Sequence, residues 1–329
     1  MSLLETRNLK KYFEVPSGTL HAVDDISITI DKGKTLGIVG ESGCGKSTLG
    51  KLIMKLSNPT EGQILFDGMD IAPLDAKEFK PYRYDIQMIF QDPYATLDGR
   101  MSVSKLIAEP FIVSKTIKEK SALDEKVEEL MDVVGLSKRV KNSYPHELDG
   151  GRRQRIGIAR ALALNPRFIV CDEPVSALDV SIQAQTLNLL QDLQEQKQLT
   201  YMFITHDMSV VKHIANDIAV MYLGQIVEKC ESGQLFKNTM HPYSKALLSA
   251  IPVPDIHRPR QKILLKGELT SPINPGPGCR FAPRCPHATD RCFKEDPVLT
   301  EAETGHFVKC HLYNTSCEVK EEQSPGDEQ

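Results

Sequence analysis

The stretch GESGCGKST, residues 40–48, constrains the fold of this chain more than any other. It follows a short apolar run at residues 36–39 and precedes apolar residues that recur at the spacing of a helix. These residues are Leu49, Leu52, Ile53 and Leu56. A glycine-rich loop between a strand and a helix, with the pattern G-x-x-x-x-G-K-S, predicts a phosphate-binding loop.

The phosphate-binding loop implies a nucleoside triphosphate and Mg²⁺ as ligands. Backbone N–H groups of such a loop turn toward the phosphates, and the helix N-terminus adds partial positive charge. Lys46 is expected to reach the β- and γ-phosphate oxygens, while Ser47 is expected to bind Mg²⁺. The expected nucleotide-binding residues are Gly40, Glu41, Ser42, Gly43, Cys44, Gly45, Lys46, Ser47 and Thr48.

Two more apolar runs end in residues that can act on a phosphate. Residues 168–171 lead into Asp172 and Glu173, and residues 201–205 lead into His206. Parallel strands of an α/β sheet place ligand-binding groups at their carboxyl ends. We therefore expect Asp172 to hold Mg²⁺, Glu173 to polarise an attacking water, and His206 to lie near the γ-phosphate. Solvated loop acids and a structural histidine are the alternatives.

The overall composition argues against several other classes of protein. The first residues, MSLLETRNLKKYF, contain no apolar core of a signal peptide, and no later run approaches the ~20 apolar residues of a membrane span. We expect the chain to stay in the cytosol without crossing a bilayer. A net charge of −4 gives no broad cationic face, so nucleic acid is not expected as a partner.

A helical segment separates the phosphate loop from the Asp172–Glu173 strand. It runs from Met101 to about Tyr144, and SALDEKVEELMDVVGL lies at its centre. The apolar residues of this centre follow helical spacing with acids and lysines between them, which predicts an amphipathic helix. They are Val127, Leu130, Met131 and Val134.

The last quarter of the chain is rich in cysteine and proline. HPYSKALLSAIP predicts a short helix, and the proline- and glycine-rich stretch after it predicts an extended connector. Of eight cysteines, Cys279, Cys285, Cys292, Cys310 and Cys317 lie near the end. The intervals between the first four are five, six and seventeen residues, without the close pair typical of zinc modules. The spacing alone is about as consistent with an iron–sulfur cluster as with zinc. Cys317 is expected to be a surface thiol.

Together these motifs resemble the nucleotide-binding subunit of an ATP-binding cassette (ABC) transporter, over about residues 4–317. The resemblance implies an α/β P-loop NTPase fold. This fold has a RecA-like α/β core, an antiparallel β subdomain and an inserted α-helical subdomain, here followed by a small cysteine-rich C-terminal extension. The implied units are a nucleotide-binding domain at 1–235, with its helical subdomain at about 95–160, then a connector at 236–278, a cysteine-rich domain at 279–317 and a disordered acidic tail at 318–329.

The same resemblance assigns roles to further residues. Gln91 in IFQDP is similar to the family's lid glutamine, which meets Mg²⁺ and water and lies next to the transmembrane partner. Ser176 and Asp179 belong to a loop similar to the one that crosses the dimer interface. Thr205-His206-Asp207 is similar to the switch-histidine motif, and Phe13 occupies the place where the family stacks adenine. In the family, the helical subdomain docks a coupling helix of the membrane partner.

The C-terminal stretch is similar to that of the oligopeptide and dipeptide importers. Some members of this branch hold a [4Fe–4S] cluster, and the ligands carried across are Cys279, Cys285, Cys292 and Cys310. The chain resembles the subunit lettered F. The implied partners are a D-type ATPase subunit, two transmembrane permease subunits and an extracellular peptide-binding protein. The implied location is the cytoplasmic face of the membrane. A soluble ABC-type ATPase acting on nucleic acid or ribosomes is the alternative.

The signature motif departs from the family pattern at Asp149. LDGGR stands where the family reads LSGGQ, whose serine and glycines contact the γ-phosphate held by the partner ATPase; here these residues are Asp149, Gly150, Gly151 and Arg152. Asp caps a helix about as well as Ser does, so we expect Asp149 to cap the following helix. A carboxylate cannot donate a hydrogen bond to phosphate, a loss of about 1.5–3 kcal/mol. Arg152 is expected to offset part of it by pairing with Asp149 or with the phosphate.

Overall fold

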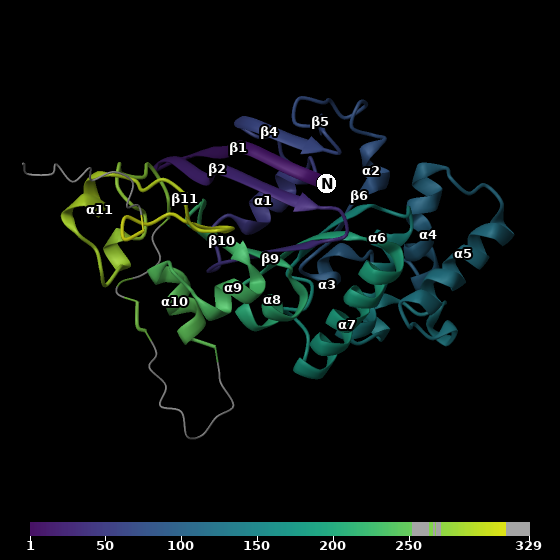
Figure 1. The fold of residues 1–329 in the computed structure, drawn as a ribbon. Coiled ribbons are helices and arrows are strands. Elements are labelled where there is room, and N and C mark those ends of the chain that lie inside the picture. The colour runs from purple at the N-terminus through teal and green to yellow at the C-terminus, as the bar shows by residue number, and fades with distance from the viewer. Residues whose placement is uncertain (252–262, 266, 268–270, 314–329) are drawn as a thin grey trace, which may run out of the picture.

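The computed structural model describes residues 1–251, 263–265, 267 and 271–313. The predicted tail at 318–329, the surface thiol Cys317 and part of the predicted connector lie outside the described residues. Within them the chain forms two β-sheets and a set of helices that flank the larger sheet (Figure 1).

The larger sheet has eight strands in the order β11-β12-β10-β9-β3-β8-β7-β6. Strands β9, β3, β8, β7 and β6 run parallel, and β10, β12 and β11 add on in antiparallel fashion. Their bounds are β3 Thr35–Val39, β6 Ile86–Ile89, β7 Phe168–Asp172, β8 Thr200–Thr205, β9 Asp217–Tyr222, β10 Gln225–Glu231, β11 Thr300–Glu303 and β12 His306–Val308.

The central strands are buried along their whole length because helices and the second sheet cover both faces. Every residue of β3, β7 and β8 is buried, as expected of parallel strands inside an α/β sheet. Their carboxyl ends lie at one edge of the sheet. That edge therefore brings together the phosphate loop after β3, Glu173 after β7 and His206 after β8.

The smaller sheet is antiparallel, with the order β2-β1-β4-β5. Its strands are β1 Ser2–Val15, β2 Gly18–Asp31, β4 Glu61–Phe66 and β5 Met69–Asp70. In β2, Ile26, Ile28 and Ile30 are buried and alternate with exposed residues, which is the pattern of a strand with one covered face. These isoleucines pack in one cluster with Leu49 and Leu52 of α1 (Lys46–Ile53).

Helices form a layer beneath the larger sheet and a lobe at one end of it (Figure 1). They are α2 Tyr82–Asp85, α3 Pro93–Thr96, α4 Val103–Ser114, α5 Lys120–Val133, α6 Gly150–Leu162, α7 Val180–Lys197 and α8 Met208–Ile214. The predicted amphipathic helix is confirmed, since Val127, Leu130 and Met131 of α5 are buried. The prediction for Leu56 is wrong, because α1 ends at Ile53 and Leu56 is 59% exposed beyond its last turn.

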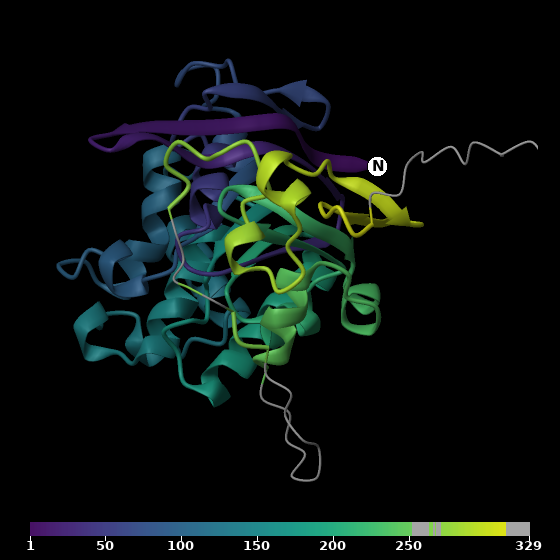
Figure 2. The same ribbon diagram turned by 90° about the vertical axis from the view of Figure 1, so that its left-hand side faces the viewer.

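The C-terminal elements lie at the opposite end of the molecule from α4 and α5 (Figures 1 and 2). They are α9 Ser232–Lys237, α10 Pro242–Ser249, the 3-10 helix η3 Ala282–Arg284 and α11 Asp290–Lys294, followed by β11 and β12. Strand β12 pairs with β10, so this segment completes the larger sheet. We refer to the described residues from 271 to 313 as the C-terminal extension. No helix in the described ranges is long and apolar enough to cross a membrane.

Candidate nucleotide-hydrolysis site

The phosphate loop between β3 and α1 is closed around the Lys46 ammonium. Lys46 Nζ donates to the carbonyl oxygens of Gly40, at 2.8 Å, and of Glu41, at 2.9 Å, and the residue is only 4% exposed. Gly45 has φ +104°, and a Cβ there would lie 2.0 Å from the carbonyl oxygen of Ala22. Glycine is therefore required at this position, both for the backbone conformation and for the close approach of β2.

Two oxygen ligands suited to Mg²⁺ meet at the end of the loop. Ser47 Oγ donates to Asp172 Oδ1 at 2.9 Å, although the two residues come from α1 and β7. Burial raises the pKa of Asp172, and the hydrogen bond from Ser47 opposes that rise. Hydroxyl and carboxylate oxygens are the donors that Mg²⁺ prefers, so the pair fits this ion.

Glu173 lies between two of the predicted catalytic side chains. Gln91 Nε2 donates to Glu173 Oε2 at 2.9 Å, and His206 Nδ1 lies 3.3 Å from Glu173 Oε1. The three residues follow β6, β7 and β8, so adjacent parallel strands bring them together. The Glu173 side chain is 11% exposed and its backbone has φ +45°. A glutamate held in this uncommon conformation is typical of functional sites.

The two adjacent aromatic residues of β1, Tyr12 and Phe13, have different surroundings. Tyr12 stacks on His21 with a centroid separation of 3.9 Å and donates its hydroxyl to Asp24. Phe13 is 39% exposed, with the Lys11 ammonium 4.9 Å from its ring centroid. Phe13 therefore has the exposed ring of the two, and its stacking on a base stays a prediction.

The signature segment begins α6, and Asp149 caps this helix as predicted. Asp149 Oδ1 accepts from the backbone N–H of Arg152 at 2.7 Å, and Arg152 Nε lies 3.4 Å from Asp149 Oδ2. Gly150 and Gly151 pack against Leu178 and Ile182, and an added Cβ at Gly151 would lie 2.7 Å from Ile182 Cγ2.

The segment that contains Ser176 and Asp179 links this signature region to the hydrolysis site. Ser176 Oγ donates to the carbonyl oxygen of Glu173 at 3.1 Å, and Asp179 immediately precedes α7. Among the described residues, no hydrogen bond or ion pair joins Asp149 or Arg152 to the phosphate loop, Glu173 or His206. Gln91, Glu173 and His206 therefore contact one another directly, whereas none of these contacts involves the signature.

The predicted cysteine ligands line one cavity of about 180 Å³ in the C-terminal extension. These residues are Cys279, Cys285, Cys292 and Cys310. Burial raises the pKa of Cys279 to about 11 and also raises the pKa of Cys285 and Cys310. Within the described residues no group of three or more His, Cys, Asp or Glu side chains could hold a metal ion, so the predicted metal site is not found in this arrangement.

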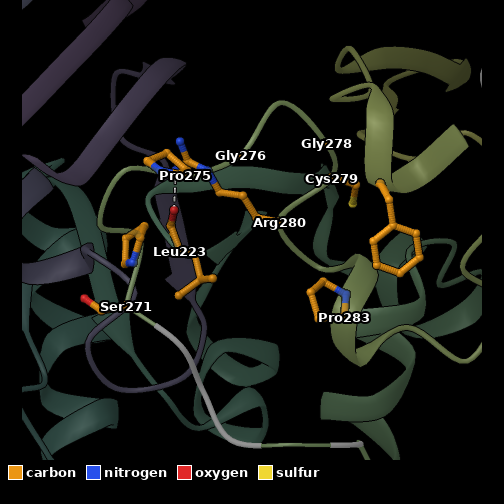
Figure 3. Close-up of a pocket in the computed structure, with 10 residues that line it drawn as sticks. Leu223, Ser271, Pro275, Gly276, Gly278, Cys279, Arg280 and Pro283 are labelled. Atoms are coloured by element: carbon orange, nitrogen blue, oxygen red, sulfur yellow. Dashed lines mark hydrogen bonds between the residues drawn. The ribbon is translucent and has the colours of Figure 1, made fainter. Parts of the chain in front are cut away.

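Sequence reasoning missed three residues of the C-terminal part that contact the nucleotide site. Arg284 pairs with the Glu41 carboxylate, and the Tyr243 hydroxyl accepts from the Glu41 backbone N–H. Arg280 donates to Asp24. It also donates to the carbonyl oxygen of Leu223, as Figure 3 shows. No periodicity or local motif marks these side chains, because their partners Glu41 and Asp24 lie more than 200 positions earlier in the chain.

Two sequence families match this chain. The family described as ABC transporter matches residues 23–176, and the family described as oligopeptide/dipeptide transporter, C-terminal region, matches residues 227–292. The first match contains the phosphate loop, Gln91, the signature and Glu173. The second begins in β10 and reaches the third of the four cysteines that line the cavity.

Similar proteins cover nearly the whole chain. The oligopeptide transport ATP-binding protein AppF of Bacillus subtilis is 51% identical over 325 residues, which cover 95% of this chain and 98% of AppF. The oligopeptide transport ATP-binding protein OppF of Haemophilus influenzae is 49% identical, with 92% of each chain covered. Among solved structures, the ATP-binding cassette MJ0796, dimeric and bound to ADP and Pi, is 28% identical with a TM-score of 0.65. It matches 98% of its own length but 70% of this chain.

Proposed function

Because the chain belongs to the ATP-binding subunits of the oligopeptide and dipeptide ABC transporters, we propose that it binds and hydrolyses ATP to drive peptide uptake. The observation that carries the catalytic part is Glu173, which contacts both Gln91 and His206 beside the Ser47–Asp172 pair. This arrangement gives a carboxylate to orient water next to groups that bind phosphate and Mg²⁺.

Each residue of the site has a separate role in ATP hydrolysis. Lys46 binds the β- and γ-phosphate oxygens, and the loop N–H groups of residues 40–48 accommodate the rest of the phosphate chain. Glu173 accepts a hydrogen bond from the attacking water, while Gln91 and His206 hold its carboxylate in place. Ser47, Asp172 and Gln91 would hold Mg²⁺, which neutralises charge on the phosphates. Phe13 stacks on adenine.

Two such ATPase subunits would act as a head-to-tail pair. The separation of Asp149, Gly150, Gly151 and Arg152 from this chain's own Glu173 supports a role in the partner's site, together with the interface loop at Ser176 and Asp179. We propose a D-type ATPase subunit as that partner. The composite site completed by Asp149 would be the slower one, since a carboxylate repels phosphate. Restoring Asp149→Ser should raise turnover at that site, and equal turnover at both sites of the unaltered pair would overturn the asymmetry.

A groove beside the hydrolysis site supports docking of the membrane subunits. A cavity of about 300 Å³ opens between β6, α4 and α6, and Phe90, 43% exposed, forms part of its wall. Gln154 Nε2 and Arg160 Nε line the same groove and are buried without a partner among the described residues. Gln91 follows Phe90 directly, so a permease segment seated here would contact the residue that holds Glu173.

The assembly would comprise this chain, the second ATPase subunit, two transmembrane permease subunits and an extracellular peptide-binding protein. Its place would be the cytoplasmic face of the membrane. Residues 1–235 would be the nucleotide-binding domain with the helical subdomain at about 95–160, 236–278 the connector, and 279–317 the cysteine-rich part. The alternative, a soluble ATPase on nucleic acid or ribosomes, is less consistent with the match of residues 227–292 to the transporter C-terminal region.

We propose a [4Fe–4S] cluster as the group that the four cysteines would hold, with zinc as the alternative. A cluster bears one thiolate on each of four irons, so its ligands are spread around a larger object. Cys279, Cys285, Cys292 and Cys310 surround a single cavity, as a cluster requires. Bound iron would fasten this part of the chain.

Transport and the cofactor are tested separately. The assembled transporter in vesicles should take up peptide when ATP is supplied, and Lys46→Ala should abolish uptake; recovery of the chain with ribosomes and not with permeases would contradict the transport function. Iron and acid-labile sulfide should each be near four per chain and fall in Cys292→Ser. One zinc per chain and no sulfide would overturn the cluster.

A further inference from the structure

Glu41 is the second residue of the phosphate loop. Two residues nearer the C-terminus, Tyr243 and Arg284, form hydrogen bonds to it. Arg284 Nη1 and Nη2 donate to the two carboxylate oxygens at 2.7 and 3.2 Å. The Tyr243 hydroxyl accepts from the Glu41 backbone N–H at 2.9 Å. Residues far along the chain from the phosphate loop therefore fix both the side chain and the main chain of Glu41.

The Arg284–Glu41 contact is a largely buried ion pair with two hydrogen bonds, which is a strong type of ion pair. The Arg284 side chain is 10% exposed and the Glu41 side chain 28%, so water screens the pair little. A forked, two-bond contact also fixes the direction of the carboxylate more tightly than a single bond would. The hydrogen bonds to Glu41 raise the pKa of Arg284, so the guanidinium stays charged.

The charge of Glu41 makes this contact relevant to ATP. An uncompensated carboxylate in a loop that binds phosphate would repel the ligand. Arg284 neutralises that carboxylate and holds it in one direction. At the same time, the Tyr243 contact fixes the first turn of the loop, from which the carbonyls of Gly40 and Glu41 face Lys46.

Packing fixes Arg284 and Tyr243 independently of any ligand. Tyr243 of α10 is fully buried, with its ring 4.6 Å from that of Tyr222 and 5.5 Å from that of Phe281. Phe281 directly precedes η3, whose last residue is Arg284. The aromatic cluster Tyr222–Tyr243–Phe281 therefore places both contacts on the phosphate loop at once.

We propose that Arg284 and Tyr243 are positioning residues of the phosphate loop, through which the C-terminal part of the chain sets the affinity of the site for ATP. A second contact has the same direction: Arg280 pairs with Asp24, which accepts the hydroxyl of Tyr12 beside the predicted adenine-stacking Phe13. The inference rests on the proposed function, because it concerns the binding of ATP.

The test measures equilibrium binding of ATP and ADP to the purified full chain. Arg284→Ala should weaken binding of both nucleotides about tenfold, and Arg284→Lys less, since lysine keeps the charge but not the fork. Tyr243→Phe should weaken binding about threefold and keep the ring in the aromatic cluster. The matched control is Lys309→Ala, which removes an ion pair of similar burial with Asp296 elsewhere in the extension and should leave affinity unchanged.

A double-mutant cycle with Glu41→Gln separates positioning from general damage. In that background the Arg284→Ala effect should shrink below about threefold, because the amide has no charge to neutralise. In the assembled transporter Arg284→Ala should raise KM for ATP and spare kcat, since Arg284 does not touch Glu173 or His206. Thermal unfolding identifies any variant that fails to fold. If Arg284→Ala fails to fold, ATP binding by Tyr243→Phe tests the positioning role instead.

The outcomes distinguish this inference from the proposed function. If the unaltered chain binds no ATP, the proposed function fails. If it binds ATP and both Arg284→Ala and Tyr243→Phe bind equally well, the positioning role alone is overturned. An Arg284→Ala effect that persists undiminished in Glu41→Gln would also overturn it.

Discussion

The nucleotide site and the C-terminal extension hold their functional side chains by different means. Asp172 ends the buried strand β7, and Glu173 and His206 directly follow β7 and β8, so the sheet sets the positions of all three. The extension consists of short turns, the helices η3 and α11 and a small hairpin, and polar contacts over long sequence distances fasten it. Substitutions in the first region should therefore change chemistry with little loss of stability, while those in the second should change stability or affinity.

The largest effect expected in the nucleotide site is on rate. Glu173→Gln removes the carboxylate that orients water, so ATP turnover of the assembled transporter should fall by about 10²- to 10⁴-fold. The amide still fits between Gln91 and His206, so binding of ATP and the free energy of unfolding should change little. Steady-state turnover, equilibrium binding and denaturant unfolding measure the three quantities. A large loss of stability would contradict the distinction between the regions.

A substitution in the core sheet, at the residue that fastens the C-terminal elements to it, should make the chain unfold more easily. Glu228 of β10 is fully buried and accepts from the backbone N–H groups of Met240 and His241 and from His306 Nε2, at 2.7, 3.1 and 2.8 Å. Glu228→Ala leaves these donors unpaired, and the free energy of unfolding should fall by about 3–5 kcal/mol.

Denaturant unfolding checks the Glu228 prediction against a matched carboxylate. Glu303 on β11 is exposed and accepts from Asn238, so Glu303→Ala should cost less than about 0.5 kcal/mol. Equal effects of the two substitutions would show that the Glu228 contacts do not fasten the C-terminal part to the core sheet.

A pH dependence of stability should arise from the same contacts. Burial lowers the pKa of His241 to about 4 from its ordinary 6.5. The unfolded chain therefore binds a proton at this residue between pH 6.5 and 4 while the folded chain does not, so stability falls as pH falls through that window. The expected loss is about 2–3 kcal/mol.

His241→Asn tests this pH dependence without removing the helix cap. His241 Nδ1 accepts from the Tyr243 backbone N–H, a bond that an asparagine oxygen can replace. Urea unfolding at several pH values should give a flatter profile between pH 6.5 and 4 for the variant. Parallel profiles for the variant and the unaltered chain would assign the pH dependence to other groups.

The smallest effect is expected at the signature helix, whose cap lies on the surface. Asp149→Ala removes the acceptor for the Arg152 backbone N–H and should cost about 1 kcal/mol of stability. Asp149→Ser keeps an acceptor at the same place and should cost nearly nothing. Thermal unfolding of the two variants side by side gives the comparison, and a loss in Asp149→Ser as large as in Asp149→Ala would refute the capping role.

The structure brings Gln91, Glu173 and His206 together, as expected from sequence signals that are local. The order of strand, loop and helix, and the acids and histidine directly after apolar runs, fix which residues reach the sheet edge. Contacts such as Arg284–Glu41 were not predictable, since they depend on how distant segments pack. Strand β12 was missed because a run of three residues, His306–Val308, has too little pattern and forms by pairing with β10. Apolar periodicity also did not predict where α1 ends, since Leu56 fits the helical spacing but lies beyond Ile53.

The pairing of β12 with β10 also bears on how the chain folds as it is synthesised. Strand β12 is made about 80 residues after β10, so the outer edge of β10 has no partner until late in translation. An open strand edge is a template for association with other chains. Chaperone demand or aggregation of nascent chains should therefore be concentrated in the interval before residue 306 emerges from the ribosome, and a premature stop in that interval should give an insoluble product.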